Sequence, residues 1–301
     1  MAQWTENSII QKMRGLLPGG ELLNDDCGVL PVESRQKIVV STDSMQEETH
    51  FSLDWHPPHL LARKLLKINL SDVDASGGTP YAFTFNFGLP PHFEETWIDT
   101  FLRSLGDCAR EHSVKVIGGD TFGSPRGLHL TATVFGYADR HLTRVGIEVG
   151  DNIYVDGPPG LSDQGLSALR AGERWDLEST SSALLQHLDP KVNIGLGVAL
   201  AKIPQVHVCM DVSDGLSKDL GILAEMNQKT IRLVRSFSDS ELHGGEDYLR
   251  LFASSLSLEE LNQRFPFPFQ QIAQVEALQG SFLVDSLGAK VENYTFNHFQ
   301  K

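Results

Sequence analysis

Apolar and polar residues follow two different rhythms along the first half of the chain, and each rhythm predicts one kind of element. Two segments, 57–73 and 93–112, place apolar residues at helical spacing, so we expect amphipathic helices there. Short apolar or alternating runs around them predict strands. These runs are 37–42, 81–89, 114–120 and 127–136. The first half therefore predicts an α/β unit of about 140 residues, the size of a typical domain.

The pattern changes near residues 144–160, where Gly, Pro and Asp gather around a short strand, as is common at a domain boundary. Beyond this segment, helical and strand patterns alternate again. The expected helices are 162–172, 179–188, 213–226 and 257–265, and the expected strands are 206–210, 230–234, 247–253 and 270–278. Both halves place a strand before an acidic turn, so we expect two related α+β domains, residues 1–138 and 139–301.

Composition narrows the class of function. Hydrophobic residues make up 41% and charged residues 21% of the 301 residues, as in ordinary globular proteins. The net charge of −14 leaves no basic stripe that could neutralise phosphates, so we expect no nucleic-acid partner. An acidic solvated surface is the common cause of such an excess, and bound cations are a less common one.

Cysteine usage and apolar runs indicate the compartment. Cys27, Cys108 and Cys209 lie far apart without a CxxC pair, which argues against a disulfide framework and a zinc site and suits a reducing cytosol. The N-terminus has no basic region followed by an apolar stretch, so we expect no signal peptide. No apolar run approaches the about 18 residues that cross a bilayer. These features predict a cytoplasmic protein without a membrane partner.

Acidic turns are the most informative feature of the sequence. They recur as "NDDCG", "STDSM", "SDVDASGG", "GGDTF", "DVSDG" and "GGEDY". Taken alone, each has an ordinary explanation: Asp25 and Asp26 suit a turn, Asp43 can follow a strand, and Ser213 is a good helix N-cap. Six such turns in one chain favour a site for several metal ions. Magnesium takes oxygen ligands and often bridges carboxylates to substrate phosphates.

Other chemistries lack their motifs. The chain contains no G-x-x-x-x-G-K-[ST] phosphate loop, no H-R-D kinase signature and no G-x-S-x-G nucleophile elbow. "GLGVAL" begins like a dinucleotide fingerprint but ends in Leu200 inside a helical pattern, which indicates helix packing. His56 and His59 flank two prolines, so a loop is favoured over a zinc-binding helix. A nucleotide site here would be built from acidic turns, magnesium and Gly-Gly backbone.

The ordered set of motifs resembles one family. The motifs are "NDDCGVL", "STDSMQEETHF", "KINLSDVDASGGTP", "VIGGDTFGSP", "TRVGIEVGDNIYVDG", "DVSDGLSKDLG" and "GGEDYLRLF". Together they resemble the thiamine-monophosphate kinases of the aminoimidazole-ribonucleotide-synthetase-like superfamily, in unbroken order over residues 4–299. The resemblance implies a two-domain α+β synthetase-like fold. It also implies a homodimer joined through the N-terminal domain sheet, and ATP bound with several Mg²⁺ ions. The aromatic residues of 81–89 are a second reason to expect the dimer.

The resemblance also implies a role for each matching residue. The metal ligands would be Asp26, Ser41, Thr42, Asp43, Asp72, Asp120, Asp211 and Asp214. ATP would meet Gly119, Asp120, Arg144 and Ser213, and thiamine monophosphate would meet His50, Glu246 and Phe296. Asp72, Asp120 and Asp211 would be the catalytic residues. The implied reaction is direct in-line transfer of the γ-phosphoryl group of ATP to thiamine monophosphate, because the acceptor phosphate is already a nucleophile.

The chain departs from the family pattern at four positions: Asn24, Leu161, Asn193 and Leu249, where Gly, Asp, Arg and Glu are usual. The segment before Gly244 is also short. A catalytically degenerate paralogue that binds nucleotide or thiamine phosphates without turnover is therefore an alternative, and a related superfamily synthetase is another. The hydrogenase-maturation relatives use a C-terminal cysteine, whereas this chain ends in "NHFQK".

Overall fold

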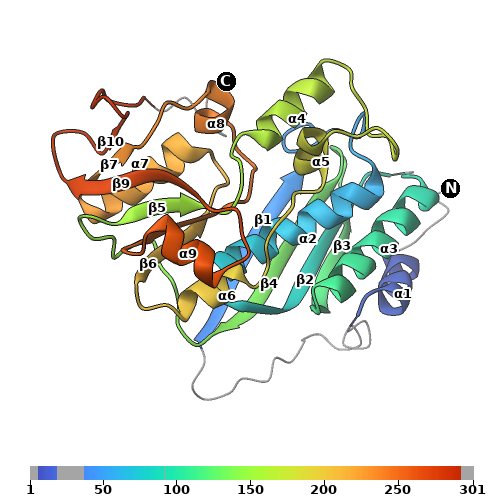
Figure 1. The fold of residues 1–301 in the computed structure, drawn as a ribbon. Helices are drawn as coiled ribbons and strands as arrows, with labels where there is room; N and C mark the ends of the chain where they lie inside the picture. The colour runs from blue at the N-terminus through green and yellow to red at the C-terminus, as the bar shows by residue number, and fades with distance from the viewer. Residues whose placement is uncertain (1–5, 19–36, 92, 293–301) are drawn as a thin grey trace. The chain divides into compact units, whose positions relative to one another are not determined.

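The computed structural model describes residues 6–18, 37–91 and 93–292. For residues 6–10, it describes the main chain alone. The chain divides into two compact units (Figure 1). Unit 1 comprises residues 1–74 and 78–139, and unit 2 comprises residues 75–77 and 140–301. Both units combine helices with a sheet, which confirms the predicted α+β class.

Unit 1 is built on a four-stranded sheet. Its strands are β1 (Lys37–Gln46), β2 (Thr79–Leu89), β3 (Lys115–Gly123) and β4 (His129–Ala138). The order across the sheet is β1-β4-β2-β3, so β1 and β3 are the two edges. β4 pairs antiparallel with both of its neighbours, and β2 pairs parallel with β3.

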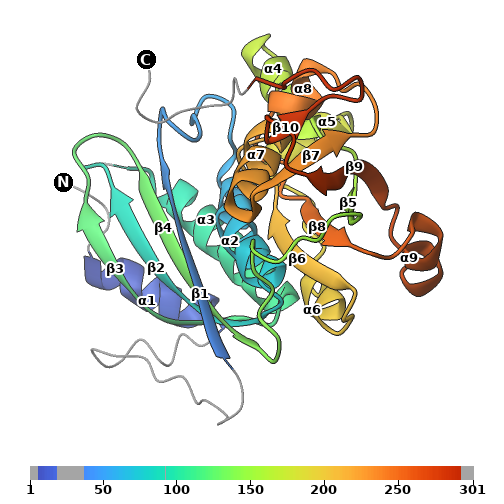
Figure 2. The same ribbon diagram turned by 90° about the vertical axis from the view of Figure 1, so that its left-hand side faces the viewer.

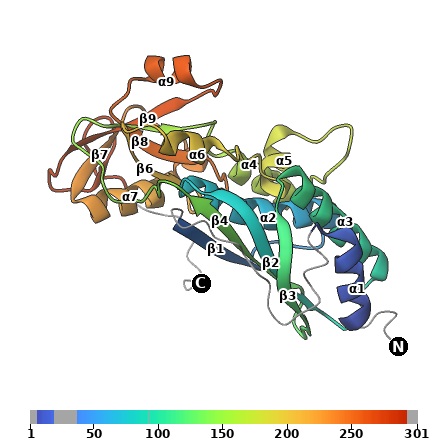
Figure 3. The ribbon, with the colours of Figure 1, turned by 90° about the horizontal axis from the view of Figure 1, so that it is seen from below.

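Three helices cover one face of this sheet, as Figures 2 and 3 both show. They are α1 (Glu6–Leu16), α2 (Pro58–Ala75) and α3 (Glu95–Glu111). Beneath α3, the rings of Phe85 and Phe87 stack on Phe101 at centroid distances of 5.8 and 5.4 Å. Since Phe83, Phe85 and Phe87 are all buried, these three aromatic side chains of β2 belong to the core of unit 1, whereas Tyr81 is half-buried. The three phenylalanines do not offer the contact surface for a second subunit that the sequence suggested.

Unit 2 is built on a six-stranded sheet of order β10-β7-β9-β5-β8-β6. Its strands are β5 (Asn152–Val155), β6 (Val206–Asp211), β7 (Lys229–Leu233), β8 (Arg250–Ser254), β9 (Gln270–Ala277) and β10 (Leu283–Val284). Its helices are α4 (Leu161–Arg170), α5 (Ser182–Leu188), α6 (Leu196–Ala201), α7 (Leu216–Asn227), α8 (Asp239–His243) and α9 (Leu258–Arg264).

Both faces of the six-stranded sheet are buried. Along β5, Ile153 and Val155 join the core that contains α7, whereas Tyr154 joins the core that contains α6 and α9. This alternation is the two-residue period of a strand. Figure 3 shows α7 and α9 on opposite sides of the sheet.

Most of the expected elements are present, and the differences have local causes. β1 continues through Asp43 to Gln46, because it pairs with β4 along its whole length. β8 begins at Arg250, not at Asp247, because Glu246 and Tyr248 have φ values of 63° and 52°, which no strand tolerates. α7 begins after Gly215, which occupies the N-cap position, so the reading of Ser213 as an N-cap is wrong. Among the described helices, none has the length and apolar character of a membrane span.

Candidate functional site

Ser41 and Asp72 form the first functional pair in unit 1. The Ser41 hydroxyl donates to Asp72 Oδ2 at 2.5 Å, which joins β1 to the last turn of α2. One turn earlier in α2, Asn69 Oδ1 accepts the Asp43 main-chain N–H at 2.9 Å. Positions three apart share one face of a helix, so Asn69 and Asp72 both face the edge strand β1. The structure therefore brings Ser41, Asp43 and Asp72 together.

Asn69 was not identified from the sequence. It is fully buried, and its amide donates to the Leu65 carbonyl at 3.0 Å while its oxygen holds the main chain at Asp43. An asparagine within a helical run carries no signal of such a long-range contact. Its position one turn before Asp72, on the same helix face, is the only hint that the sequence offers.

Thr42 lies on the other face of β1. Its hydroxyl donates to the Ala132 carbonyl at 3.1 Å and accepts from the Thr133 hydroxyl at 2.9 Å, both on β4. Successive side chains of a strand point to opposite faces, so the Thr42 side chain points away from Ser41 and Asp72. The structure does not bring this side chain to the other expected ligands.

Gly119 and Asp120 lie on β3, at the opposite edge of the sheet from β1. Gly119 has φ +152°, and a Cβ atom there would collide with the Phe85 carbonyl, so only glycine fits. The register runs from Asp43 through Ala132 and Phe85 to Gly119. Asp43 and Asp120 are thus about three strand spacings, or about 14 Å, apart. Within one subunit, the structure does not bring Asp120 to Asp43 and Asp72.

His50 follows β1 in a turn. The Gln46 main-chain N–H donates to His50 Nδ1 at 3.0 Å. Because Nδ1 accepts a hydrogen bond, the neutral ring carries its proton on Nε2. The side chain is half-buried, so this histidine is fixed in orientation and is more than the surface residue that the sequence alone would suggest.

Two of the predicted motifs meet in unit 2. The "DVSDG" turn follows β6, and the "GGEDY" loop precedes β8. The Glu246 N–H donates to the Ser213 carbonyl at 2.7 Å, and the Tyr248 N–H donates to the Val212 carbonyl at 2.8 Å. A Cβ atom at Gly245 would lie 2.6 Å from the Ser213 carbonyl oxygen, so the glycine permits this contact. The structure therefore places Asp211, Ser213, Asp214 and Glu246 in one region.

Asp219 adds a fourth carboxylate to this region. It is buried, and its Oδ2 accepts the Asp214 N–H at 3.3 Å. The pKa of Asp219 is raised to about 7, chiefly by burial and also by the charges of Asp214 and Asp211, while the hydrogen bond from Asp214 and the charge of Arg144 act in the opposite direction. Lys218 offsets part of the negative charge through an ion pair with Asp214 at 2.9 Å. Sequence reasoning missed Asp219, which stands five residues after Asp214.

Glu246 has a strained main chain and a buried neighbour. Its φ of 63° lies in the left-handed region, where a non-glycine residue is held only by its surroundings, and such strain is common at functional sites. Glu246 Oε2 lies 3.5 Å from Nδ1 of the buried His187, which also contacts the Ser162 hydroxyl at 3.0 Å. The Glu246 carboxylate thus has a defined neighbour on α5.

Asp247, the next residue, faces inward. Its carboxylate accepts the main-chain N–H groups of Gly160 and Ser162 at 2.5 and 2.9 Å, at the start of α4. Burial raises the pKa of Asp247 to about 6, although these two hydrogen bonds lower it. Its role is to hold the "GGEDY" loop to α4.

Two expected site residues, Asp26 and Phe296, lie outside the described residues. Among residues 6–18, 37–91 and 93–292, no three His, Cys, Asp or Glu side chains form a group that could hold a metal ion by themselves. Magnesium commonly takes one or two carboxylates together with waters and substrate phosphates, so such a group is not required for it.

Comparison with known proteins gives consistent results. The family of AIR synthase related protein, N-terminal domain, matches residues 24–138. Thiamine-monophosphate kinase of Leptospira interrogans is 35% identical over 232 residues, which cover 76% of this chain and 74% of that protein. Thiamine-monophosphate kinase of Escherichia coli K12 is 32% identical over 302 residues, which cover 92% of this chain and 91% of that protein.

Solved structures agree with these relatives. Thiamine-monophosphate kinase from Stenotrophomonas maltophilia K279a has a TM-score of 0.78 at 27% identity, and the match covers 89% of this chain and 90% of that one. AaThiL complexed with AMPPCP and TMP also has a TM-score of 0.78, at 25% identity, over 93% and 92% of the two chains. Hydrogenase maturation protein HypE, at 18% identity and a TM-score of 0.72, shares the fold alone. Since kinase relatives more than 30% identical match nearly the whole chain, it belongs to the thiamine-monophosphate kinase family.

Proposed function

We propose that this protein transfers the γ-phosphoryl group of ATP to thiamine monophosphate, forming thiamine diphosphate, with magnesium as the required ion. Its relatives are thiamine-monophosphate kinases, and AaThiL is complexed with an ATP analogue and TMP. The structural observation that carries the proposal is the contact between the "DVSDG" turn and the "GGEDY" loop. This contact brings Glu246 to the turn that carries Asp211 and Asp214, beside the buried Asp219.

The donor groups fit magnesium. The expected ligands offer only oxygen atoms, which this ion prefers, and they include no nitrogen or sulfur. The negative charges of Asp214 and Asp211 help to raise the pKa of Asp219. Nearby cationic side chains therefore do not fully offset the negative charge of this region. Asp43, Asp72 and Asp120 in unit 1 and Asp211 and Asp214 in unit 2 are the described side chains that we assign to magnesium. Bound magnesium supplies charge neutralisation and alignment of the phosphates during transfer.

The chain's own groups position the reactants. Ser41 holds Asp72 in one orientation through its hydroxyl, and Asn69 fixes the main chain at Asp43, so these carboxylates are set before substrate binds. We assign Gly119, Asp120, Arg144 and Ser213 to the nucleotide. Arg144 can donate several N–H groups to phosphate oxygens, which suits a site where charge develops during transfer.

The acceptor, thiamine monophosphate, is also positioned by residues of this chain. We assign His50 to the phosphate of thiamine monophosphate. Its Nδ1 accepts a main-chain N–H, so the neutral ring carries its proton on Nε2, and an N–H group of this kind can donate to a phosphate oxygen. Glu246 and Phe296 would hold the thiamine rings, since a cationic thiazolium ring is attracted to a carboxylate and to an aromatic face. The acceptor phosphate attacks directly, so no phosphorylated protein residue is needed.

We further propose a homodimer formed through the sheet of unit 1. Both edge strands of this sheet expose large apolar side chains, namely Ile38 and Val40 on β1 and Phe122 on β3. Two copies related by a twofold axis along the sheet can join β1 of one copy to β3 of the other. This arrangement supplies Asp120 to the Asp43–Asp72 group of the opposite copy, which one subunit cannot do alone.

We also propose that the protein is cytoplasmic. Cys108 and Cys209 are buried free thiols, as is usual in a reducing compartment.

The test of the proposed function is an assay of the purified protein with Mg-ATP and thiamine monophosphate. We expect thiamine diphosphate and ADP in equal amounts, and no product when magnesium is chelated. Binding of both ligands without product would instead identify a degenerate paralogue. Failure to bind thiamine monophosphate would overturn the kinase assignment and leave the fold unchanged.

A further inference from the structure

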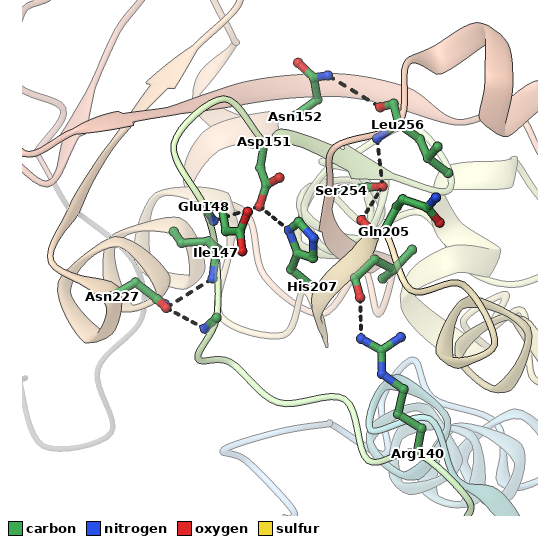
Figure 4. Close-up of polar contacts among 12 residues, drawn as sticks. Arg140, Ile147, Glu148, Asp151, Asn152, Gln205, His207, Asn227, Ser254 and Leu256 are labelled. Carbon is green, nitrogen blue, oxygen red and sulfur yellow. Dashed lines mark hydrogen bonds and ion pairs between the residues drawn. The ribbon is translucent and has the colours of Figure 1, made fainter.

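Asn227, the last residue of α7, binds the segment that leads into unit 2. Its Oδ1 accepts the main-chain N–H groups of Gly146 and Ile147 at 2.8 and 3.3 Å. Its Nδ2 donates to the Arg144 carbonyl at 2.8 Å and to the Leu223 carbonyl at 2.7 Å. Figure 4 shows Asn227 directed at this segment from the end of α7. One side chain therefore makes hydrogen bonds to three of the four residues 144–147.

The partners of Asn227 fix which way its amide points. An asparagine side chain offers one carbonyl oxygen and two N–H donors. Here two main-chain N–H groups donate to the Asn227 oxygen, and two main-chain carbonyls accept from its nitrogen. If the amide were reversed, donors would face donors and acceptors would face acceptors at all four partners. The contact is thus specific for asparagine, since neither a shorter nor a charged side chain reproduces it.

Other contacts hold the ends of the segment. At the beginning, the Arg140 guanidinium donates to the carbonyls of Ile203 and Val206 at 2.8 and 2.7 Å. At the end, Asp151 Oδ2 lies 2.8 Å from His207 Nδ1 (Figure 4).

In the middle, Ile147 is buried in the core of unit 2, and the Thr143 hydroxyl donates to the Val145 carbonyl at 2.8 Å. Gly146 has φ +130°, a conformation open to glycine and costly for other residues. Asn227 is the side chain that ties the main chain on both sides of Val145 to α7.

Arg144 is the charged residue of that middle part. Its side chain is exposed, so it can contact a ligand. The acidic turn stands at the start of α7, and Asn227 ends the same helix. The helix that begins at the acidic turn therefore also holds the main chain that carries Arg144.

From this geometry, we propose that Asn227 is a positioning residue for the nucleotide: it holds the main chain at Arg144 so that the guanidinium meets the phosphates of ATP at the acidic turn. The inference deepens the proposed function and depends on it. Sequence motifs did not point to Asn227, which lies outside all of them. Without this side chain, the segment around Gly146 gains other conformations, and Arg144 is less often in position.

The test is a double-mutant cycle on the binding of Mg-AMPPCP, an ATP analogue that is not turned over, measured by calorimetry on the full chain. We expect Asn227→Ala to raise the Kd about tenfold, and Arg144→Ala to raise it by a similar factor. The double variant should bind as Arg144→Ala does, because Asn227 acts through Arg144. The Kd of thiamine monophosphate should stay within about twofold of the wild-type value. Asn227→Asp keeps the two accepted bonds but turns a carboxylate oxygen toward the carbonyls of Arg144 and Leu223, so it holds the segment only in part and should raise the Kd by a smaller factor than Asn227→Ala.

Asn152→Ala is the matched control. Asn152 is also a half-buried asparagine of unit 2, with its amide near the Leu256 carbonyl at 3.5 Å and its oxygen accepting from Gln271 at 2.7 Å. It should lower thermal stability without changing the Kd of the analogue. Two results would overturn the inference if the wild type binds the analogue. One is that Asn227→Ala weakens binding of the analogue equally with and without Arg144, and the other is that it does not weaken binding at all. A wild type that does not bind the analogue would overturn the proposed function itself, and the inference with it.

Discussion

At the scale of single residues, the acidic positions differ in what holds them. Asp72 accepts a hydroxyl from Ser41, and Asp43 is fixed through its main chain by the buried Asn69. Glu246 has a left-handed main chain and lies beside a buried histidine. Short, rigid side chains held in this way change little when a ligand binds, which is the condition for positioning a phosphate. Two substitutions test whether these residues act on ligands or only support the fold.

Asp72→Asn removes one negative charge and keeps the shape of the side chain. The amide oxygen can still accept from Ser41, so we expect stability to change by less than about 1 kcal/mol. Mg-dependent binding of ATP should be lost, because the carboxylate is assigned to the ion. Calorimetry with and without magnesium measures the affinity for ATP. The control is Asp54→Asn, the same change at an exposed position of unit 1. Unchanged ATP affinity and magnesium dependence would make Asp72 a structural residue only.

Glu246→Gln removes the charge proposed to face the thiazolium ring. We expect the Kd of thiamine monophosphate to rise about tenfold or more and that of ATP to change far less, because ATP carries no such cation. Paired titrations of the wild type and the variant measure both values. Glu225→Gln, on the exposed side of α7, is the control for a change of net charge. Equal loss for the two ligands would show that Glu246 supports the fold of the loop and does not select the acceptor.

At the scale of elements, contacts between segments distant in the sequence build the site. The "GGEDY" loop is joined to the "DVSDG" turn by main-chain hydrogen bonds and to the start of α4 by Asp247. Nearby, the departure at Asn193 lies beside Asp156, which accepts from the Asn193 amide and from the N–H of the fully buried Arg250, both at 2.8 Å. The departure at Leu249 instead belongs to the apolar core that contains α7.

The Asp247 contact gives unit 2 a pH dependence. Its pKa is raised from 3.8 to about 6, chiefly by burial, so the folded state favours the protonated carboxyl. The stability that comes from this preference is complete below about pH 4 and is lost as the pH rises through about 6. Relative to Asp247→Asn, which cannot ionise, the free energy of unfolding of the wild type should fall by about 2 kcal/mol between about pH 4 and pH 7.

Urea unfolding of both proteins across this range measures the difference, and the other titrating groups cancel because both proteins carry them. A difference that does not depend on pH would show that the Asp247 carboxylate is as well solvated in the folded chain as in the unfolded one.

The sequence predicted the elements whose pattern is long and regular. The helices over α2 and α3 and the strands over β2, β4 and β9 follow from apolar spacing alone. The elements α1, α8 and β10 were not predicted, since two of them are only five and two residues long and their pattern is too short to read. Asn69 and Asn227 were missed because their contacts depend on tertiary folding, and no local spacing encodes them. Asp219 accepts from the main chain five residues away, and its burial is the property that the sequence does not show.

At the scale of the whole molecule, the strand order has a consequence for catalysis. β1 carries Ser41 and Asp43 at one edge of the unit 1 sheet, and β3 carries Asp120 at the other. Residues at opposite edges of one sheet cannot hold the same ion. The proposed dimer, which joins unlike edges, would bring these residues together, and each of its two sites would then take residues from both copies.

Mixing inactive variants tests the shared site. Asp43→Asn and Asp120→Asn should each inactivate the enzyme, yet their mixed dimer contains one intact site and one site with both changes. Random pairing makes half of the dimers mixed, so co-expression should restore about a quarter of the wild-type activity. Asp43→Asn with Asp72→Asn is the control, because these two residues lie in the same subunit's group and no intact site can form. No recovery in the first mixture would place Asp120 outside the shared site.

The most direct test of the central claim is a single-turnover, rapid-quench measurement with γ-labelled ATP, magnesium and thiamine monophosphate. Direct transfer predicts that the label appears in thiamine diphosphate at the rate at which ATP disappears, with none bound to protein at any time. Label trapped on a residue of the chain would contradict direct transfer. Label released as inorganic phosphate without thiamine diphosphate would contradict the kinase function itself.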